Sequence, residues 1–130
     1  MGCRLVRVLI RVPDIETAAA YYDYVLGVSG RRVSPGRHHL ALGDIELACY
    51  DPVADGDLND TAQSPSLWQL YIAADDVEAV LERVQSASGR VEQPISTKPW
   101  GERSFYAFDP FGNRLCFIDS GSLRPHSSIR

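Results

Sequence analysis

Cysteine is scarce in this chain, and the few cysteines form no recognisable pattern. The 130 residues contain three of them, an odd number without a CxxC pair. They are Cys3, Cys49 and Cys116. A disulfide framework needs paired cysteines and a zinc knuckle needs closely spaced ones, so neither is expected. The expected location is the reducing cytoplasm.

A long apolar run is also missing. The opening residues MGCRLVRVLIRV are interrupted by Arg4, Arg7 and Arg11, and no other stretch is long enough to cross a membrane. We therefore expect neither a secretory signal nor a membrane span. The net charge of −4 gives no overall basic field for a polyanion, so nucleic acid is not an expected partner.

What the sequence does contain is an internal repeat. The segment VLIRVPDIETAAAYYDYVLG aligns without a gap on LYIAADDVEAVLERVQSASG, so that Asp14 falls on Asp76 and Gly27 falls on Gly89. In each copy an alternating strand ends at an aspartate suited to N-capping a helix. The glycine suits the left-handed conformation that ends a helix. Each copy therefore predicts a strand followed by a helix of about three to four turns.

Three strand-like segments follow each predicted helix. They span residues 31–33, 38–42 and 45–50 in the first copy and residues 90–93, 105–108 and 114–118 in the second. Each half therefore reads strand, helix, strand, strand, strand. The predicted fold class is α+β, with two tandem βαβββ modules whose curved mixed sheets form a concave cavity.

A chain of 130 residues, 45% of them hydrophobic, can bury one ordinary core, so we expect a single domain over residues 1–130. Module one takes about residues 4–51 and module two about residues 67–120. Between them, about residues 52–66 are rich in Asp, Pro, Ser and Gly and form a linker or a lid, and residues 121–130 form a polar tail.

The alternation of side chains assigns the two faces of each sheet. One helix can cover only one face, which leaves the other face for a partner or a ligand. The positions expected under the helices are apolar: Val8, Ile10, Val12, Leu70, Ile72 and Ala74. The positions expected on the opposite, cavity-lining face are mixed: Arg7, Leu9, Arg11, Glu46, Ala48, Tyr50, Gln69, Tyr71, Ala73 and Cys116.

The stretches VPDIETAAAYYDYVLG and WGERSFYAFDPFGN, set in these paired modules, resemble the glyoxalase, bleomycin-resistance and extradiol-dioxygenase superfamily, also called vicinal oxygen chelate. The resemblance covers Leu5 to Asp119. It implies, in metal-dependent members, a divalent ion held by one residue from each of four strands, usually His, Glu, His and Glu, with Gln as an accepted substitute. The positions of this chain that match are Arg7, Glu46, Gln69 and Cys116.

Two of these four residues depart from the pattern that the resemblance implies. Arg7 has no lone pair and stays protonated, so it repels a dication and is better suited to an ion pair with Glu46. We therefore expect no cofactor, with a divalent metal held by Glu46, Gln69 and Cys116 as the alternative. Cys116 stands where the resemblance places a proton-transferring glutamate, which makes it a candidate catalytic residue. The alternative is that it is a small buried hydrophobe.

Aromatic and charged side chains in the second half complete the predicted binding site. Trp100 and Arg103 lie in or next to a loop beside the expected cavity mouth, and flat side chains beside charges suit a planar, partly polar molecule. The candidate ligand-binding residues are Arg7, Glu46, Gln69, Tyr71, Trp100, Arg103 and Cys116. The histidines add little: alternation lets only one of His38 and His39 face the cavity, His126 lies in the tail, and none matches a ligand position.

Two classes of function follow from the resemblance. The first is a protein of the bleomycin-resistance kind that binds a planar or natural-product-like small molecule, or a metal-independent enzyme. The second is a metal-dependent lyase, isomerase or dioxygenase with altered ligands. In either case a true glyoxalase I is not expected, because both the metal-binding histidine and the glutamate base are replaced. A third possible function is that of a structural subunit that binds no ligand. Only the aromatic side chains near the expected cavity argue against it. We further expect a homodimer.

Overall fold

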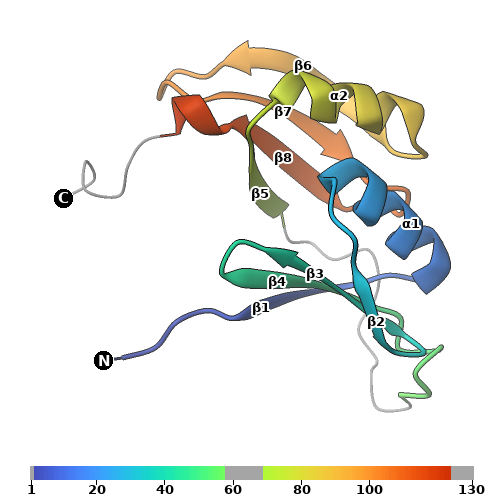
Figure 1. Cartoon of the computed structure of the whole chain (residues 1–130). Helices are drawn as coiled ribbons and strands as arrows, with labels where there is room; N and C mark the ends of the chain where they lie inside the picture. The colour runs from blue at the N-terminus through green and yellow to red at the C-terminus, as the bar shows by residue number, and fades with distance from the viewer. Residues whose placement is uncertain (1, 58–68, 124–130) are drawn as a thin grey trace. The chain divides into compact units, whose positions relative to one another are not determined.

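The computed structural model of the chain describes residues 2–57 and 69–123, which fall into two compact units (Figure 1). The first unit is Met1–Ser66 and the second is Leu67–Arg130; we call them module one and module two. Most of the predicted linker, Trp68, and residues 124–130 of the predicted tail, which include His126, lie outside the described residues. Among the residues that are described, no helix has the length and apolar character needed to cross a membrane.

Module one is one helix on a four-stranded mixed sheet. Its elements in chain order are β1 (Arg7–Arg11), α1 (Ile15–Leu26), β2 (Arg31–Ser34), β3 (Arg37–Leu42) and β4 (Ile45–Tyr50). The strand order is β1-β4-β3-β2, in which β1 runs parallel to β4 and the other neighbours are antiparallel. The β1–β4 register sets Arg7 opposite Glu46.

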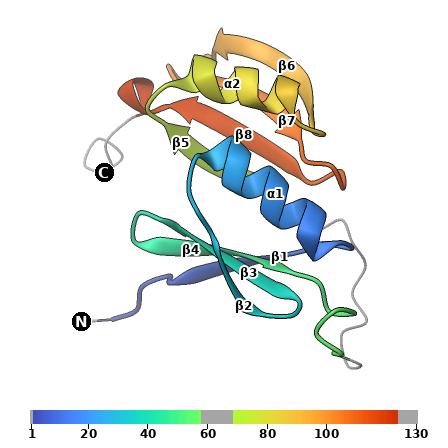
Figure 2. The same ribbon diagram turned by 45° about the vertical axis from the view of Figure 1, so that its right-hand side comes forward.

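Module two repeats this architecture. Its elements are β5 (Gln69–Ala74), α2 (Val77–Ser86), β6 (Arg90–Thr97), β7 (Arg103–Phe108) and β8 (Arg114–Asp119), followed by a short 3-10 helix, η1 (Ser120–Ser122). The strand order β5-β8-β7-β6, again with one parallel pair, is the order of module one. Figure 2 shows α2 running along one side of its own sheet. The prediction of two tandem βαβββ modules is confirmed.

Helix α1 begins and ends where the sequence predicts. The Asp14 side chain accepts hydrogen bonds from the backbone N–H groups of Glu16 and Thr17, which would otherwise lack a partner in the first turn. Gly27 ends the helix with φ of 70°, the left-handed region that a residue without Cβ enters at little cost. The two ends of the helix are therefore fixed by local chemistry.

Helix α2 begins as predicted but ends earlier than the repeat suggests. Asp76 caps its N-terminus through the backbone N–H of Ala79. The C-terminal residue, however, is followed by Ala87 in an extended conformation, so the prediction that Gly89 closes this helix is wrong. The physical reason lies in the sequence Ser86-Ala87-Ser88: serine favours a helix less than the residues before it, and the N–H of Ala87 already divides its bond between the carbonyls of Arg83 and Val84.

The core of each module lies between its helix and its sheet. The prediction of an apolar face under each helix is confirmed for Ile10, Val12 and Ala74, which are 2%, 1% and 9% exposed. Val8, Leu70 and Ile72 are only half-buried, because β1 and β5 are edge strands of their sheets. In module two the rings of Phe105 and Phe117 stack with their centroids 5.3 Å apart. Each sheet keeps an opposite face that its own helix does not cover.

Candidate functional site

An ion pair between Arg7 and Glu46 lies on the open face of module one, as predicted. The Arg7 Nε and Nη2 atoms donate to Glu46 Oε1 at 3.1 and 3.0 Å, across the parallel β1–β4 register. Arg31 of β2 donates to the other oxygen, Oε2, at 3.4 Å. The hydrogen bond from Arg7 is the main cause that lowers the pKa of Glu46, so this carboxylate is ionised at neutral pH.

His39 lies beside this ion pair and is the residue that the sequence reasoning missed. Its Nδ1 is 3.4 Å from Glu46 Oε1, and its ring is 6% exposed. Neither ring nitrogen makes a hydrogen bond within the described part of the chain. Burial is the main cause that lowers the pKa of His39; the charge of Glu46 acts in the other direction, and the charges of Arg7, Arg37 and Arg31 lower the pKa further. The imidazole is therefore neutral at pH 7.

The position of His39 follows from the alternation along β3. His38 faces the helix, where its Nε2 is 2.9 Å from Asp23 Oδ1 of α1. His39 then faces the opposite side, together with Arg37, whose guanidinium centre is 4.7 Å from the ring centroid of Tyr50. The signal was present in the sequence, but a site model based on four ligand positions had no place for a residue of β3.

The corresponding place in module two holds a second polar network, centred on Arg114. This arginine donates to Gln69 Oε1 at 2.8 Å and to Glu92 Oε1 at 2.9 Å. Its guanidinium centre also lies 4.1 Å from the ring centroid of Tyr106. In the β5–β8 register Arg114, and not Cys116, stands opposite Gln69. Gln69 is thus a hydrogen-bond acceptor for an arginine.

Cys116 is buried among polar neighbours on the same face as Arg114. It is 2% exposed, and it lies opposite Tyr71 on one side and Tyr106 on the other. Burial raises the pKa of the Cys116 thiol, although hydrogen bonds with Ser104 and Tyr106 act in the other direction. Burial also raises the pKa of Tyr106 to about 12. Both groups are protonated at neutral pH, which favours the reading of Cys116 as a small buried residue over a nucleophile or base.

The predicted aromatic residues of module two are exposed. Tyr71 is 60% exposed on β5, and its hydroxyl is 3.5 Å from Gln69 Oε1. Trp100 is 57% exposed in the turn between β6 and β7, where its Nε1 donates to Glu102 at 3.0 Å. Large exposed aromatic side chains such as these are available to stack on a planar partner.

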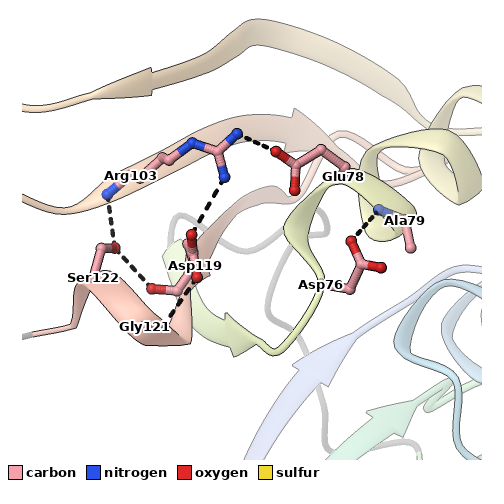
Figure 3. A network of polar contacts seen from close by, with 7 residues as sticks. All are labelled: Asp76, Glu78, Ala79, Arg103, Asp119, Gly121 and Ser122. Atoms are coloured by element: carbon pink, nitrogen blue, oxygen red, sulfur yellow. Dashed lines mark hydrogen bonds and ion pairs between the residues drawn. The ribbon is translucent and has the colours of Figure 1, made fainter.

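Arg103 lies on the helix-covered face of the module two sheet, opposite to the face that carries Tyr71 and Cys116. Figure 3 shows its guanidinium paired with Glu78 of α2 and with Asp119, the latter at 3.3 Å, while its backbone N–H donates to Ser122 at 2.9 Å. Glu78 raises the pKa of Arg103, and Arg103 in turn lowers the pKa of Glu78. These contacts join α2, β7 and the end of β8 on the helix-covered side of the sheet. A ligand contact of Arg103 stays an untested prediction.

The four positions at which the resemblance implies a metal do not fit a divalent ion. Arg7 offers only donors, and Glu46 already accepts from two guanidinium groups. Gln69 accepts from Arg114, and Cys116 carries a thiol whose pKa is raised. Across residues 2–57 and 69–123, no group of three or more His, Cys, Asp or Glu side chains is placed to hold an ion. No chemical step is therefore assigned to a metal.

Two helices, two four-stranded mixed sheets and the repeated parallel pairing define a tandem βαβββ protein of the glyoxalase type. The chain belongs to the glyoxalase/bleomycin resistance protein/dioxygenase superfamily, whose family model matches residues 4–117. The resemblance inferred from the sequence is confirmed.

Relatives of known name agree with this membership. The anthracycline biosynthesis protein DnrV of Streptomyces peucetius is 29% identical over 115 residues, which cover 77% of this chain and 41% of that protein. The protein CFP32 of Mycobacterium tuberculosis is 30% identical over 105 residues, which cover 77% of this chain and 37% of that protein. The chain thus spans about two fifths of the length of these relatives.

Solved structures show the same fold. A glyoxalase-related enzyme from Fulvimarina pelagi matches with a TM-score of 0.76 at 20% identity, covering 88% of this chain and 86% of the other. A glyoxalase/bleomycin resistance protein/dioxygenase family enzyme from Burkholderia phytofirmans matches with a TM-score of 0.75 at 18% identity, covering 89% and 98%. At these identities the likeness concerns the fold alone.

Proposed function

We propose that this protein is a metal-independent member of its superfamily that binds a planar or natural-product-like small molecule. The observation that carries the proposal is the exposure of two large aromatic side chains in module two, Tyr71 and Trp100, of which Tyr71 shares the Gln69 Oε1 atom with the cationic Arg114. Burying such rings against a flat ligand removes apolar area from water, and the nearby guanidinium adds cation–π attraction. A role in antibiotic resistance is one form that such binding takes.

One relative supports the class of ligand. The name of DnrV ties that protein to anthracycline biosynthesis, which agrees with a natural-product-like molecule as the ligand here. The ion pair of Arg7 with Glu46 supports independence from metal, because a guanidinium occupies a position at which a metal would need a lone pair.

The test of ligand binding measures, by calorimetry, the affinity of the protein for 2-naphthol, a neutral planar probe. Tyr71→Ala and Trp100→Ala should each weaken binding by roughly 3- to 10-fold, the usual worth of one aromatic contact. Tyr24→Ala is the matched control, because Tyr24 is also an exposed tyrosine, 48% exposed, and lies on helix α1 of the other module. Equal losses in all three variants, or none, would remove the support for an aromatic binding surface.

The alternative function is a metal-dependent lyase, isomerase or dioxygenase in which Glu46, Gln69 and Cys116 hold the ion. Elemental analysis of protein purified without added metal separates the two functions. The proposal expects far less than one equivalent. About one equivalent of zinc, nickel, manganese or iron that is lost in Glu46→Gln would establish the alternative.

We also propose that the protein acts in the cytoplasm as a homodimer. A single four-stranded sheet is too small to enclose a drug-sized ligand, so a second chain is the simplest way to complete a site. Light scattering at micromolar concentration should give about twice the chain mass of 14.4 kDa. A monomer under these conditions would show that the dimer is not needed for the fold.

A further inference from the structure

Three arginines gather on the open face of module one, around a single carboxylate of the sheet. Arg7 comes from β1, Arg31 from β2 and Arg37 from β3; we call them the arginine cluster. Both Arg7 and Arg31 reach Glu46, at 3.0 and 3.4 Å, and the charges of all three arginines act on His39. Arg7 and Arg31 share the one Glu46 carboxylate, and Arg37 stacks on the ring of Tyr50.

The strand register places the arginine cluster and His39 on the same face of the module one sheet. Arg31 pairs with His39 across β2 and β3, and Arg37 pairs with Tyr50 across β3 and β4. Residues directly opposite each other in a sheet point to the same side. The next residue of β2, Arg32, points to the other side, where it forms an ion pair with Glu16 of α1 at 3.1 Å. Two adjacent arginines of one strand thus have different surroundings.

His39 is a second, independent sign that this face receives a ligand. A buried polar side chain normally has a hydrogen-bond partner, and neither nitrogen of His39 has one among the described residues. The Glu46 carboxylate 3.4 Å from Nδ1 favours the tautomer with the proton on Nδ1, which leaves Nε2 as an acceptor. An acceptor at this depth needs a hydroxyl or an N–H donor, which the described residues do not supply and a ligand can.

We propose that this face binds a small hydroxycarboxylate, with the carboxylate on the arginine cluster and the adjacent hydroxyl donating to Nε2 of His39. The guanidinium fork matches the two oxygens of a carboxylate, whereas a phosphate dianion is repelled more strongly by Glu46. Because His39 is only 6% exposed, the ligand must displace a neighbouring side chain to reach Nε2. Arg31 is suited to this, since its side chain is 65% exposed and that of Arg7 is 44% exposed.

This inference rests on the proposed small-molecule function and names the chemical class of the ligand. It also assigns the two modules different tasks: charge recognition in module one and aromatic contact in module two. The neutral form of His39 is the form that accepts the ligand hydroxyl, so the binding step needs no proton transfer.

The experiment compares three probes by calorimetry: salicylate, benzoate, which lacks the hydroxyl, and phenol, which lacks the carboxylate. Salicylate should bind best, and its affinity should fall as salt is added, because screening weakens the charge contacts. Arg31→Ala and Arg37→Ala should each reduce salicylate affinity by about 10-fold, as expected for a lost charge-assisted hydrogen bond. Phenol binding should stay unchanged in both variants.

Arg32→Ala is the matched control, since it removes the same charge from the same strand on the opposite face. It should leave salicylate affinity within about twofold of the native value. His39→Phe and His39→Leu, which both lack an acceptor, should bring salicylate down to the affinity of benzoate; using two variants guards against one that fails to fold.

The outcomes separate this inference from the proposed function. If 2-naphthol and phenol bind while salicylate is no better than phenol, the inference is overturned and the proposed function stands. If salicylate binds through Arg31 and Arg37 but 2-naphthol does not bind, the planar aromatic function is overturned and the carboxylate site stands. A loss in Arg32→Ala equal to that in Arg31→Ala would show a general charge effect and overturn the inference.

Discussion

At the scale of single residues, the three thiols differ in exposure and therefore in reactivity. Cys3 is exposed, whereas Cys49 and Cys116 are buried. Burial also raises the pKa of Cys116, which lowers the fraction present as the reactive thiolate. We expect Ellman's reagent to modify one thiol quickly in the native protein and the other two at least about tenfold more slowly. Denaturant should expose all three.

Two single variants assign the fast thiol. Cys3→Ser should abolish the fast phase, and Cys116→Ser should leave it intact. Loss of the fast phase in Cys116→Ser would mean that this thiol is accessible, and its role as a candidate catalytic residue would gain support.

The residues of the site were only partly predictable from the sequence. The pairing of Arg7 with Glu46 could be predicted, because the family resemblance places both residues at positions that converge on one site, and their charges are opposite. The roles of His39 and Arg114 could not, because each depends on the register between strands. A shift of two positions decides whether Gln69 meets Cys116 or Arg114.

At the scale of elements, the two helix ends that occupy equivalent places in the repeat are built differently. Gly27 has φ of 70°, whereas Gly89 is not among the glycines with positive φ in the described residues. Gly27→Ala should therefore lower the free energy of unfolding by about 1 kcal/mol, the cost of placing a Cβ in the left-handed region. Urea unfolding followed by circular dichroism measures this difference.

Gly89→Ala is the control at the equivalent position of the repeat and should change stability by less than about 0.5 kcal/mol. A cost equal to that of Gly27→Ala would mean that helix α2 ends at Gly89 after all.

The comparison of the two ends explains why element order was easier to predict than element boundaries. Strand and helix types follow from hydrophobic periodicity, which was clear in both copies. The end of α2 depends on a tightened last turn, in which the N–H of Ala87 is shared by the carbonyls of Arg83 and Val84, a difference too small for an alignment of repeats to reveal.

At the scale of the whole molecule, the ionisable groups predict how stability varies with pH. The pKa values of Glu16, Glu46 and Glu78 are lowered, in each case chiefly by a hydrogen bond from an arginine. The unfolded chain binds protons at these groups before the folded one does, so stability is full above the ordinary value of 4.5 and is lost as the pH falls through the folded values.

His39 adds a second window at higher pH. Its pKa is lowered from 6.5 by burial, so below pH 6.5 the unfolded chain takes up a proton that the folded chain does not. The melting temperature should therefore be flat between about pH 7 and 8, decline first below about 6.5, and fall more steeply below about 4.5. His39→Leu should remove the first decline and keep the second. Persistence of the first decline in that variant would place its cause elsewhere.

The strand order of each sheet has a consequence for the sequence of events during synthesis. β1 pairs with β4, whose residues lie 39 positions further along the chain, and β5 and β8 are separated by 45 positions. The hairpins between β3 and β4 and between β7 and β8 close much shorter loops and lose less chain entropy when they form. Strand β1 therefore leaves the ribosome well before its partner, and until β4 emerges the arginine-rich edge of β1 remains open to solvent, where its charges discourage pairing with another chain.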